Sequence, residues 1–206
     1  MASELTGRRV AFLTANEGVE QVELTAPWQA VKDAGGTPEL LAPKTGTVQG
    51  FNHLDRADRF EVHRSVRDAD PLDYDALVVP GGVANADELR AVPAAVTFAQ
   101  RIFEMGKTAA VICHGPWLLV EADLVRARTL TSWPSLKTDI RNAGGQLGGR
   151  RGPGVHRWPE RHRHQPEAGR PARVLRGAGQ AVPAAVPAVL SAEPHPGRRE
   201  SSRGRL

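Results

Sequence analysis

Three short apolar runs, each followed by a turn, constrain the fold of this chain most. They are RRVAFLT at residues 8–14, DALVVPGG at 75–82 and KTAAVICHG at 107–115. Each is too short for a helix and has the length of a buried strand. Helix-like spacing of apolar residues follows, as in residues 20–34, which end at a double glycine. Short buried strands that alternate with helices are typical of a parallel sheet covered on both faces, so we predict an α/β fold.

The remaining elements fit this alternation. Further strands are predicted at residues 37–43 and 128–134, and residues 45–70 carry the local alternation of a small antiparallel excursion. The apolar spacing also predicts helices over residues 87–105, 116–125 and 135–143. Residues 1–146 therefore form one predicted domain.

Composition restricts the compartment. The chain has 206 residues, 40% of them apolar, which is enough for a substantial core. A single cysteine excludes an internal disulfide framework and fits a reducing compartment. The first residues lack the apolar centre of a signal peptide, and no run approaches the length of a membrane span. We therefore expect a cytoplasmic protein that has no membrane partner.

Residues 147–206 differ in kind from the rest. They hold 12 arginines and no lysine against four glutamates and no aspartate, a net charge of +8, whereas residues 1–146 carry −4. Eight prolines and nine glycines also lie there. Such a segment buries too little apolar surface to offset chain entropy, so we predict a disordered basic tail. Nucleic acid is expected to bind only through this tail, if at all.

Cys113 follows a predicted buried strand, and a predicted helix begins just after it, at Pro116. This is the arrangement of a nucleophile elbow, with cysteine in place of serine. The helix N-terminus would stabilise a thiolate there. The alternative is an inert buried cysteine, because free cysteine is among the most buried residue types.

Two other segments reach the same edge of the predicted sheet. VVPGG at residues 78–82 ends a strand, and its glycines allow backbone N–H groups to approach a ligand as an oxyanion hole. The segment after the first strand offers Glu17, Glu20 and Glu23, any of which could contact Cys113 and change its pKa. Alternatively, these acids simply favour a helix N-terminus. His53 and His63 show no metal-ligand spacing, and the four histidines of residues 147–206 could bind a metal only adventitiously. Neither a metal nor another cofactor is expected.

Several motifs taken together resemble the ThiJ/PfpI superfamily, and within it the branch of PfpI-type intracellular proteases and deglycases. The similar segments lie between residues 8 and 146 and include FLTANEGVEQVEL, DYDALVVPGG, AAVICHGPW and TLTSWPSLKTDIRNAGGQ. The resemblance implies a flavodoxin-like sheet sandwiched by helices and related to class I glutamine amidotransferase domains. Relatives often have glycine where this chain has Ala127.

The resemblance also implies roles for particular residues. Cys113 matches the nucleophile, and Glu20 matches the carboxyl group that contacts the thiol. Gly82 and His114 match the backbone donors of the oxyanion hole. In the protease, an acidic residue after the glycine turn orients His114 from an adjacent subunit, and Asp87 is the match for it. This implies a homo-oligomer.

The function implied is a cysteine-dependent hydrolase that cleaves peptides or repairs glyoxal-type adducts, with a peptide or a small molecule as substrate. The two activities are not distinguished at this point. The alternative is a redox-sensing or chaperone-like stress protein without robust catalysis, because an accessible thiolate oxidises readily.

The family pattern stops after NAGGQ. An acidic hairpin, a further strand with a Ser-Arg motif and a C-terminal helix would follow, so these elements are missing or replaced. Back-translation of residues 147–206, read one base later, permits segments of that missing pattern. We hypothesise that the reading frame changes between Gln146 and Leu147, with a genuine basic tail as the alternative.

Sequencing of the gene around codons 146 and 147 in independent isolates tests the change of frame. We expect a one-base insertion or deletion there relative to intact genes. The frame-restored protein should be more soluble and more active, because the missing strand and helix would cover an apolar sheet edge. An unbroken frame in all isolates, or equal melting temperature and activity in the two proteins, contradicts the hypothesis.

Overall fold

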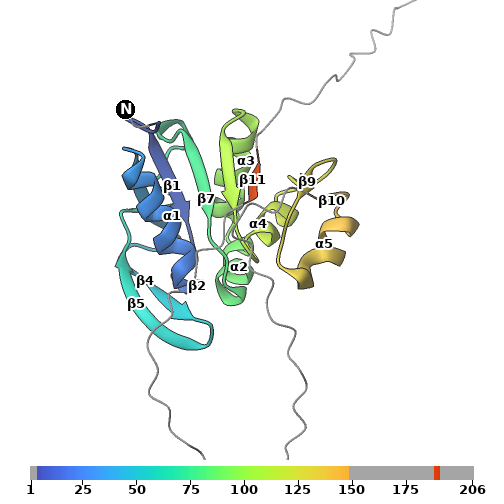
Figure 1. Cartoon of the computed structure of the whole chain (residues 1–206), viewed down its shortest axis with the longest axis horizontal. Coiled ribbons are helices and arrows are strands. Elements are labelled where there is room, and N and C mark those ends of the chain that lie inside the picture. The colour runs from blue at the N-terminus through green and yellow to red at the C-terminus, as the bar shows by residue number, and fades with distance from the viewer. Residues whose placement is uncertain (1–3, 149–187, 191–206) are drawn as a thin grey trace, which may run out of the picture.

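A computed structural model describes residues 4–148 and the backbone of residues 188–190 (Figure 1). Its main sheet contains five mutually parallel strands in the order β8-β7-β1-β3-β6. These strands are β1 (Arg9–Leu13), β3 (Thr37–Ala42), β6 (Arg64–Ser65), β7 (Ala76–Val79) and β8 (Thr108–Val111). The run β3-β1-β7-β8 corresponds to the first four strands of the flavodoxin-like order. The predicted α/β fold with a parallel sheet is confirmed.

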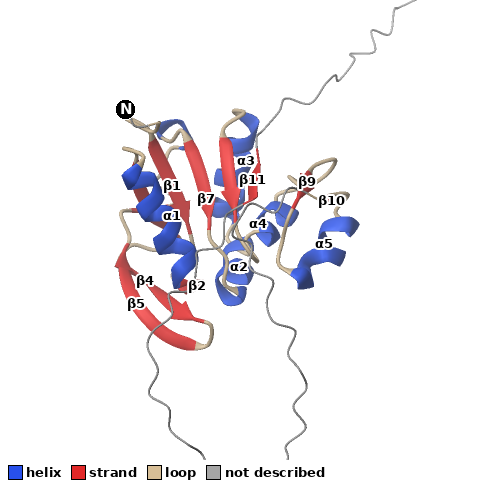
Figure 2. Cartoon of the chain, viewed as in Figure 1, coloured by secondary structure: helices blue, strands red, loops and turns tan. Residues whose placement is uncertain are grey.

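Helices cover both faces of this sheet (Figure 2). Side chains of β1 alternate between two cores, because successive residues of a strand point to opposite faces. Val10 and Phe12 pack in the core that includes Leu24 of α1 (Gln21–Asp33). Ala11 and Leu13 belong to the other core, which α3 (Pro93–Glu104) and α4 (Pro116–Glu121) help to form. Within the described residues, no helix has the length and apolarity needed to cross a membrane.

The single helix predicted over residues 87–105 is wrong. The structure has two helices there, α2 (Val83–Arg90) and α3, which begins at Pro93. Val92 adopts an extended conformation, with φ −97° and ψ 107°. A residue before proline is pushed out of the helical region, and proline itself is favourable at the first helical position. The apolar periodicity continues across this break and therefore hid it.

The predicted antiparallel excursion is confirmed as a hairpin of β4 (Thr47–Asn52) and β5 (Asp55–Glu61). One strand beside it was not predicted: β2 (Glu17–Glu20) pairs in parallel with β4. Because β2 runs directly into α1, its pairing places the hairpin turn alongside the start of that helix (Figure 1).

After α4, a second small sheet forms from β9 (Thr129–Leu130) and β10 (Gln146–Leu147), which flank α5 (Lys137–Asn142). Leu147 thus pairs with Leu130, one residue past the predicted domain boundary. Ala127, where relatives often have glycine, has φ +59°, a conformation that favours glycine.

Residues 188–190 form β11, which pairs antiparallel with the outer edge of β8. The rest of the tail that was predicted to be disordered lies outside the described residues. So do most of the residues that the proposed change of frame would alter.

Asn85, on α2, joins the two central strands where they end. Its side chain is fully buried. The oxygen accepts from the Ala15 N–H at 2.7 Å, just after β1. The amide nitrogen donates to the carbonyls of Pro80 and Gly81 at 3.0 and 2.9 Å, just after β7. One side chain therefore fixes the glycine turn relative to β1.

Replacing Asn85 with alanine leaves one N–H and two carbonyl groups buried without these partners. We expect Asn85→Ala to lower the free energy of unfolding by about 3 kcal/mol, because each unpaired buried group costs about 1–3 kcal/mol. Urea unfolding measures this. The control is Asn16→Ala, whose hydrogen bonds are exposed, with an expected loss of less than about 1 kcal/mol. Equal losses in the two variants would show that burial of Asn85 has no special importance.

Candidate active site

Cys113 lies in the sharp turn between β8 and α4. Its φ is +56°, in the left-handed region that a residue other than glycine adopts only when its surroundings hold it there. The preceding Ile112 N–H donates to the Val79 carbonyl at 3.0 Å. At Gly115, a β-carbon would lie 2.8 Å from the same carbonyl oxygen, so only glycine fits. The strand–cysteine–helix arrangement predicted from the sequence is therefore formed, and it is packed against the end of β7.

Gly81 leaves room for a carboxyl group to lie beside the thiol. Its N–H donates to Glu23 Oε2 at 2.8 Å. A β-carbon at this position would lie 2.5 Å from Glu23 Oε2 and 2.6 Å from Cys113 Cβ. No side chain can occupy this space without moving one of them. The first glycine of the PGG turn is thus required for the contact between Glu23 and Cys113.

Glu23, in the first turn of α1, supplies the carboxyl group that contacts Cys113. Burial raises the pKa of Glu23 to about 7, although the Gly81 N–H and the contact with Cys113 oppose the shift. The nearby charge of Glu20 raises it further. Near neutral pH this carboxyl group is therefore poised to gain or lose a proton.

The prediction that Glu20 contacts the thiol is wrong. Glu20 is the last residue of β2, and α1 begins after it. Its carboxylate accepts the backbone N–H of His53 at 3.2 Å, on the side of the β4–β5 hairpin. Sequence spacing could not distinguish the two glutamates, because residues three apart on a helix share a face. The pairing of β2 decides the matter by keeping Glu20 out of the helix.

The Cys113 thiol is half-buried. Burial raises its pKa, and so do the charge of Glu23 and the hydrogen bond with it. The backbone N–H groups of Gly82 and His114 face the sulfur and act in the opposite direction. These are the two donors that the resemblance implies for the oxyanion hole. When Glu23 is protonated, its charge no longer opposes the thiolate, so the two groups can share a single proton.

His114 is held from several sides. Nδ1 lies 3.2 Å from Cys113 Sγ, and Nε2 lies 3.4 Å from Ser135 Oγ. The ring also packs against Trp117 and Trp133, with centroids 5.5 and 5.6 Å away. Burial lowers the pKa of His114, which favours the neutral imidazole.

Sequence reasoning missed Ser135 and Trp133 as parts of the site. The Trp133 N–H donates to the Cys113 carbonyl at 2.8 Å, so the loop after β9 is tied directly to the elbow. The position of SWPS at the end of a predicted strand was the available clue, because ligands bind at the carboxyl ends of parallel strands.

Asp87 lies on the exposed side of α2 and forms an ion pair with Arg90 at 3.2 Å. Its predicted role is to orient His114 of an adjacent subunit. A single chain does not test that role, which stays a prediction.

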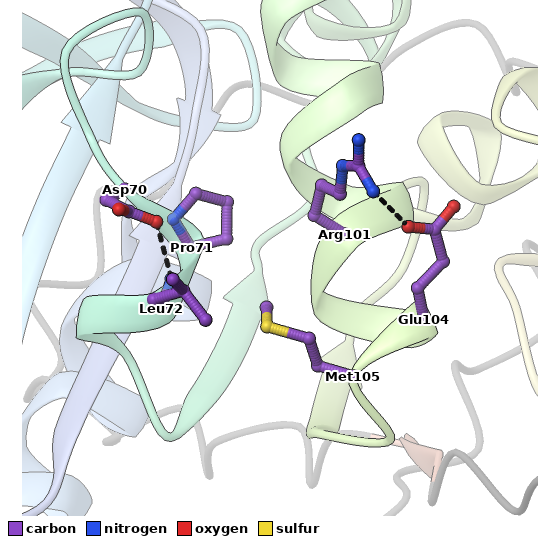
Figure 3. Close-up of a pocket in the computed structure, with 6 residues that line it drawn as sticks. All are labelled: Asp70, Pro71, Leu72, Arg101, Glu104 and Met105. Atoms are coloured by element: carbon purple, nitrogen blue, oxygen red, sulfur yellow. Dashed lines mark hydrogen bonds and ion pairs between the residues drawn. The ribbon is translucent and has the colours of Figure 1, made fainter.

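A separate pocket of about 330 Å³ lies between α3 and η1 (Pro71–Asp73) (Figure 3). These segments precede β7 and β8, whereas Cys113 follows β8, so the pocket lies at the opposite edge of the sheet. Leu72 and Met105 line it, and the ion pair of Arg101 and Glu104 forms part of its wall. Neither here nor elsewhere in the described part of the chain do three or more potential metal ligands gather.

A flavodoxin-like sheet with a strained cysteine elbow, a facing carboxyl group and two backbone donors defines the class of this protein. The sequence profile of the DJ-1/PfpI family matches residues 8–156. The chain belongs to this family.

Three relatives are similar over most of their length. A protein of Pyrococcus horikoshii named a deglycase is 38% identical over 66% of this chain and 78% of its own. The deglycase PfpI of Pyrococcus furiosus is 34% identical, with the same coverage. A Bacillus subtilis protein named a "putative cysteine protease" is 31% identical over 66% of this chain and 78% of its own.

Solved structures agree on the fold. The ThiJ/PfpI domain protein of Brachyspira murdochii superposes with a TM-score of 0.65 at 16% identity, over 71% of this chain and 82% of that one. A two-domain protein of Anabaena variabilis gives 0.62 at 29% identity over 70% of this chain. The match spans 40% of that second protein, which also contains a ferritin-like domain.

The raised pKa of Glu23 predicts a pH dependence of stability. Its ordinary value is 4.5 and its folded value is about 7, so between these pH values the folded chain binds a proton that the unfolded chain has lost. The stability of the wild type relative to Glu23→Gln should therefore fall, by at most about 3 kcal/mol, as pH rises from about 4.5 to above 7.

Urea unfolding from pH 4 to 8 measures this difference. The exposed Glu88 provides the matched variant Glu88→Gln, which should follow the wild type at every pH. A constant difference between the wild type and Glu23→Gln would mean that Glu23 does not carry the extra proton.

Proposed function

We propose that this protein is a cysteine-dependent hydrolase that removes glyoxal-type carbonyl adducts from amines or thiols. The observation that carries the proposal is the contact of Glu23 with Cys113 at an elbow where two backbone N–H groups also face the sulfur. The nucleophilic sulfur is thus surrounded by a proton acceptor and by two N–H donors for an oxyanion. A thiol that must stay reduced suits work in the cytoplasm.

In the first step, the thiol proton passes to the Glu23 carboxylate, and the sulfur attacks the carbonyl carbon of the adduct. The S–C bond forms as the C=O π bond opens. The N–H groups of Gly82 and His114 face the sulfur and are therefore placed to receive the negative charge that develops on the oxygen. The neutral His114, with Nδ1 3.2 Å from Sγ, is available to pass a proton to the leaving amine or thiol. That group leaves as its bond to the neighbouring hydroxyl-bearing carbon breaks and the hydroxyl becomes a carbonyl group. The S–C bond then breaks, which restores the Cys113 thiol and releases the dicarbonyl compound to be hydrated by water.

Repair of adducts is favoured over peptide hydrolysis by the surroundings of His114. In the described chain its side-chain contacts are Cys113, Ser135 and two tryptophans, and no carboxylate is among them. Without an acidic partner, the imidazole is a weaker acid for protonating the leaving nitrogen of a peptide amide, a poor leaving group. The hemiaminal or hemithioacetal of a glyoxal-type adduct opens with less help from an acid. Two of the relatives reported above are named deglycases.

Peptide hydrolysis is the second candidate. The observation that favours it is the exposed position of Asp87 on α2, from which it could reach another subunit. We propose that Asp87 of a second copy would supply the missing acid in a homo-oligomer. A relative of this chain carries a protease name.

Replacement of Cys113 tests the proposal. Purified wild type and Cys113→Ala are compared on methylglyoxal-treated N-acetylcysteine, on methylglyoxal-treated N-acetyllysine and on a fluorogenic peptide. We expect wild-type activity on the adducts and a loss of more than about a thousandfold in the variant, as for other catalytic nucleophiles. Equal melting temperatures of the wild type and Cys113→Ala would show that the loss of activity does not come from unfolding.

Undiminished adduct hydrolysis in Cys113→Ala would overturn the proposal. Cleavage of the peptide alone, lost on Asp87→Asn in an oligomer, would select the second candidate instead.

A further inference from the structure

Gly81 forms backbone hydrogen bonds with two glutamates, Glu23 and Glu20. Its N–H donates to the Glu23 carboxylate at 2.8 Å, and its carbonyl accepts the Glu20 N–H at 3.4 Å. Glu20 also packs against the next glycine, because a β-carbon on Gly82 would lie 2.8 Å from the Glu20 nitrogen. The backbone of Glu20 is therefore fixed against the turn that faces the Cys113 sulfur.

The side chain of Glu20 is held on its other side by the β4–β5 hairpin. It is 18% exposed, and Oε2 lies 3.2 Å from the His53 backbone nitrogen and 3.9 Å from His53 Nδ1. His53 has φ +60°, so the hairpin turn adopts a strained conformation where it meets Glu20. The partly buried carboxylate of Glu20 is thus kept in place between the hairpin and the glycine turn at residues 81–82.

The charges around Glu20 come from several elements. His53 faces it from the hairpin, and Glu23 of α1 feels its charge. Glu17, on the same strand, is instead paired with Arg56 at 2.8 Å and is exposed. On α2, which packs against β2, Asp87 is paired with Arg90, and Glu88 is exposed. The charge of Glu20 raises the pKa of Glu23, whereas the neighbours that act most on the Cys113 thiol are Glu23 and the backbone N–H groups of Gly82 and His114.

We propose that Glu20, anchored by His53, is a positioning residue that keeps the shared proton on Glu23 and the negative charge on the Cys113 sulfur. The pair has two forms with the same net charge, a thiol with a carboxylate and a thiolate with a carboxylic acid. A fixed negative charge next to Glu23 disfavours the first form and so favours the reactive thiolate. The proposal rests on the proposed function only in taking Cys113 as the nucleophile.

Alkylation of the full-length protein by iodoacetamide tests this without any substrate. The thiolate displaces iodide, so that an S–C bond forms, a C–I bond breaks, and the proton remains on Glu23. The rate is measured by mass spectrometry from pH 5 to 9. We expect Glu20→Gln to lower the rate near neutral pH by about three- to tenfold, since one unit of pKa difference corresponds to a factor of ten.

Glu17→Gln is the matched control, because it removes the same charge from the same strand at a position already paired with Arg56. It should leave the alkylation rate unchanged. A faster reaction in Glu20→Gln would show that Glu20 merely repels the thiolate, and an equal effect of both substitutions would show that only net charge matters. Either result overturns the proposal.

His53→Asn provides a second variant in case Glu20→Gln unfolds. Asparagine keeps the backbone donor and tolerates positive φ, so only the imidazole is lost. Loss of the imidazole that lies 3.9 Å from Oε2 leaves the Glu20 carboxylate less firmly held. The variant should therefore react more slowly than the wild type near neutral pH, with a smaller effect than that of Glu20→Gln. Equal rates at all pH values contradict the role of His53. Alkylation needs no turnover of a substrate. Failure of this proposal can therefore be distinguished from failure of the proposed hydrolase function.

Discussion

The absence of a side chain at Gly81 is the constraint on which the rest of the site depends. Glu23 and Cys113 both lie against the position that a Gly81 side chain would occupy, because a single added carbon would be within 2.6 Å of both. The bare backbone at Gly81 therefore leaves room for the two side chains to contact each other. It also supplies the N–H that holds the carboxyl group in place. The PGG segment is thus more than a turn, because it permits the contact through which a proton can be shared.

Packing around Gly81 maintains this geometry. Asn85 fixes the turn to the end of β1, and the carbonyl of Cys113 is held by Trp133 from the loop after β9. The elbow accepts an unfavourable φ at Cys113 because hydrogen bonds on both sides compensate for it. Burial raises the pKa of Glu23, so the same packing that orders the site also tunes its protonation.

Much of the fold could be predicted from the sequence, because buried strands and amphipathic helices have distinct periods. β1, β7 and β8 lie within the predicted ranges, and Cys113 stands at the predicted elbow. The predictions failed where the spacing of apolar residues does not show where a helix or strand ends. The apolar spacing runs through Val92 and Pro93 without a gap, although the chain breaks there. The choice of Glu20 over Glu23 failed for a related reason, because the helical pattern of the sequence already begins at Glu20, which is the last residue of β2.

The sequence by itself determined the kind of chemistry available, since a lone cysteine between a buried strand and a helix, facing a double glycine, restricts the residues that could react. Only the tertiary structure decided which glutamate contacts the sulfur and which one is tied to the hairpin. That choice depends on the parallel pairing of β2 with β4 and on the approach of α1 to Gly81. Both are contacts between segments distant in the chain, and local spacing carries no information about them.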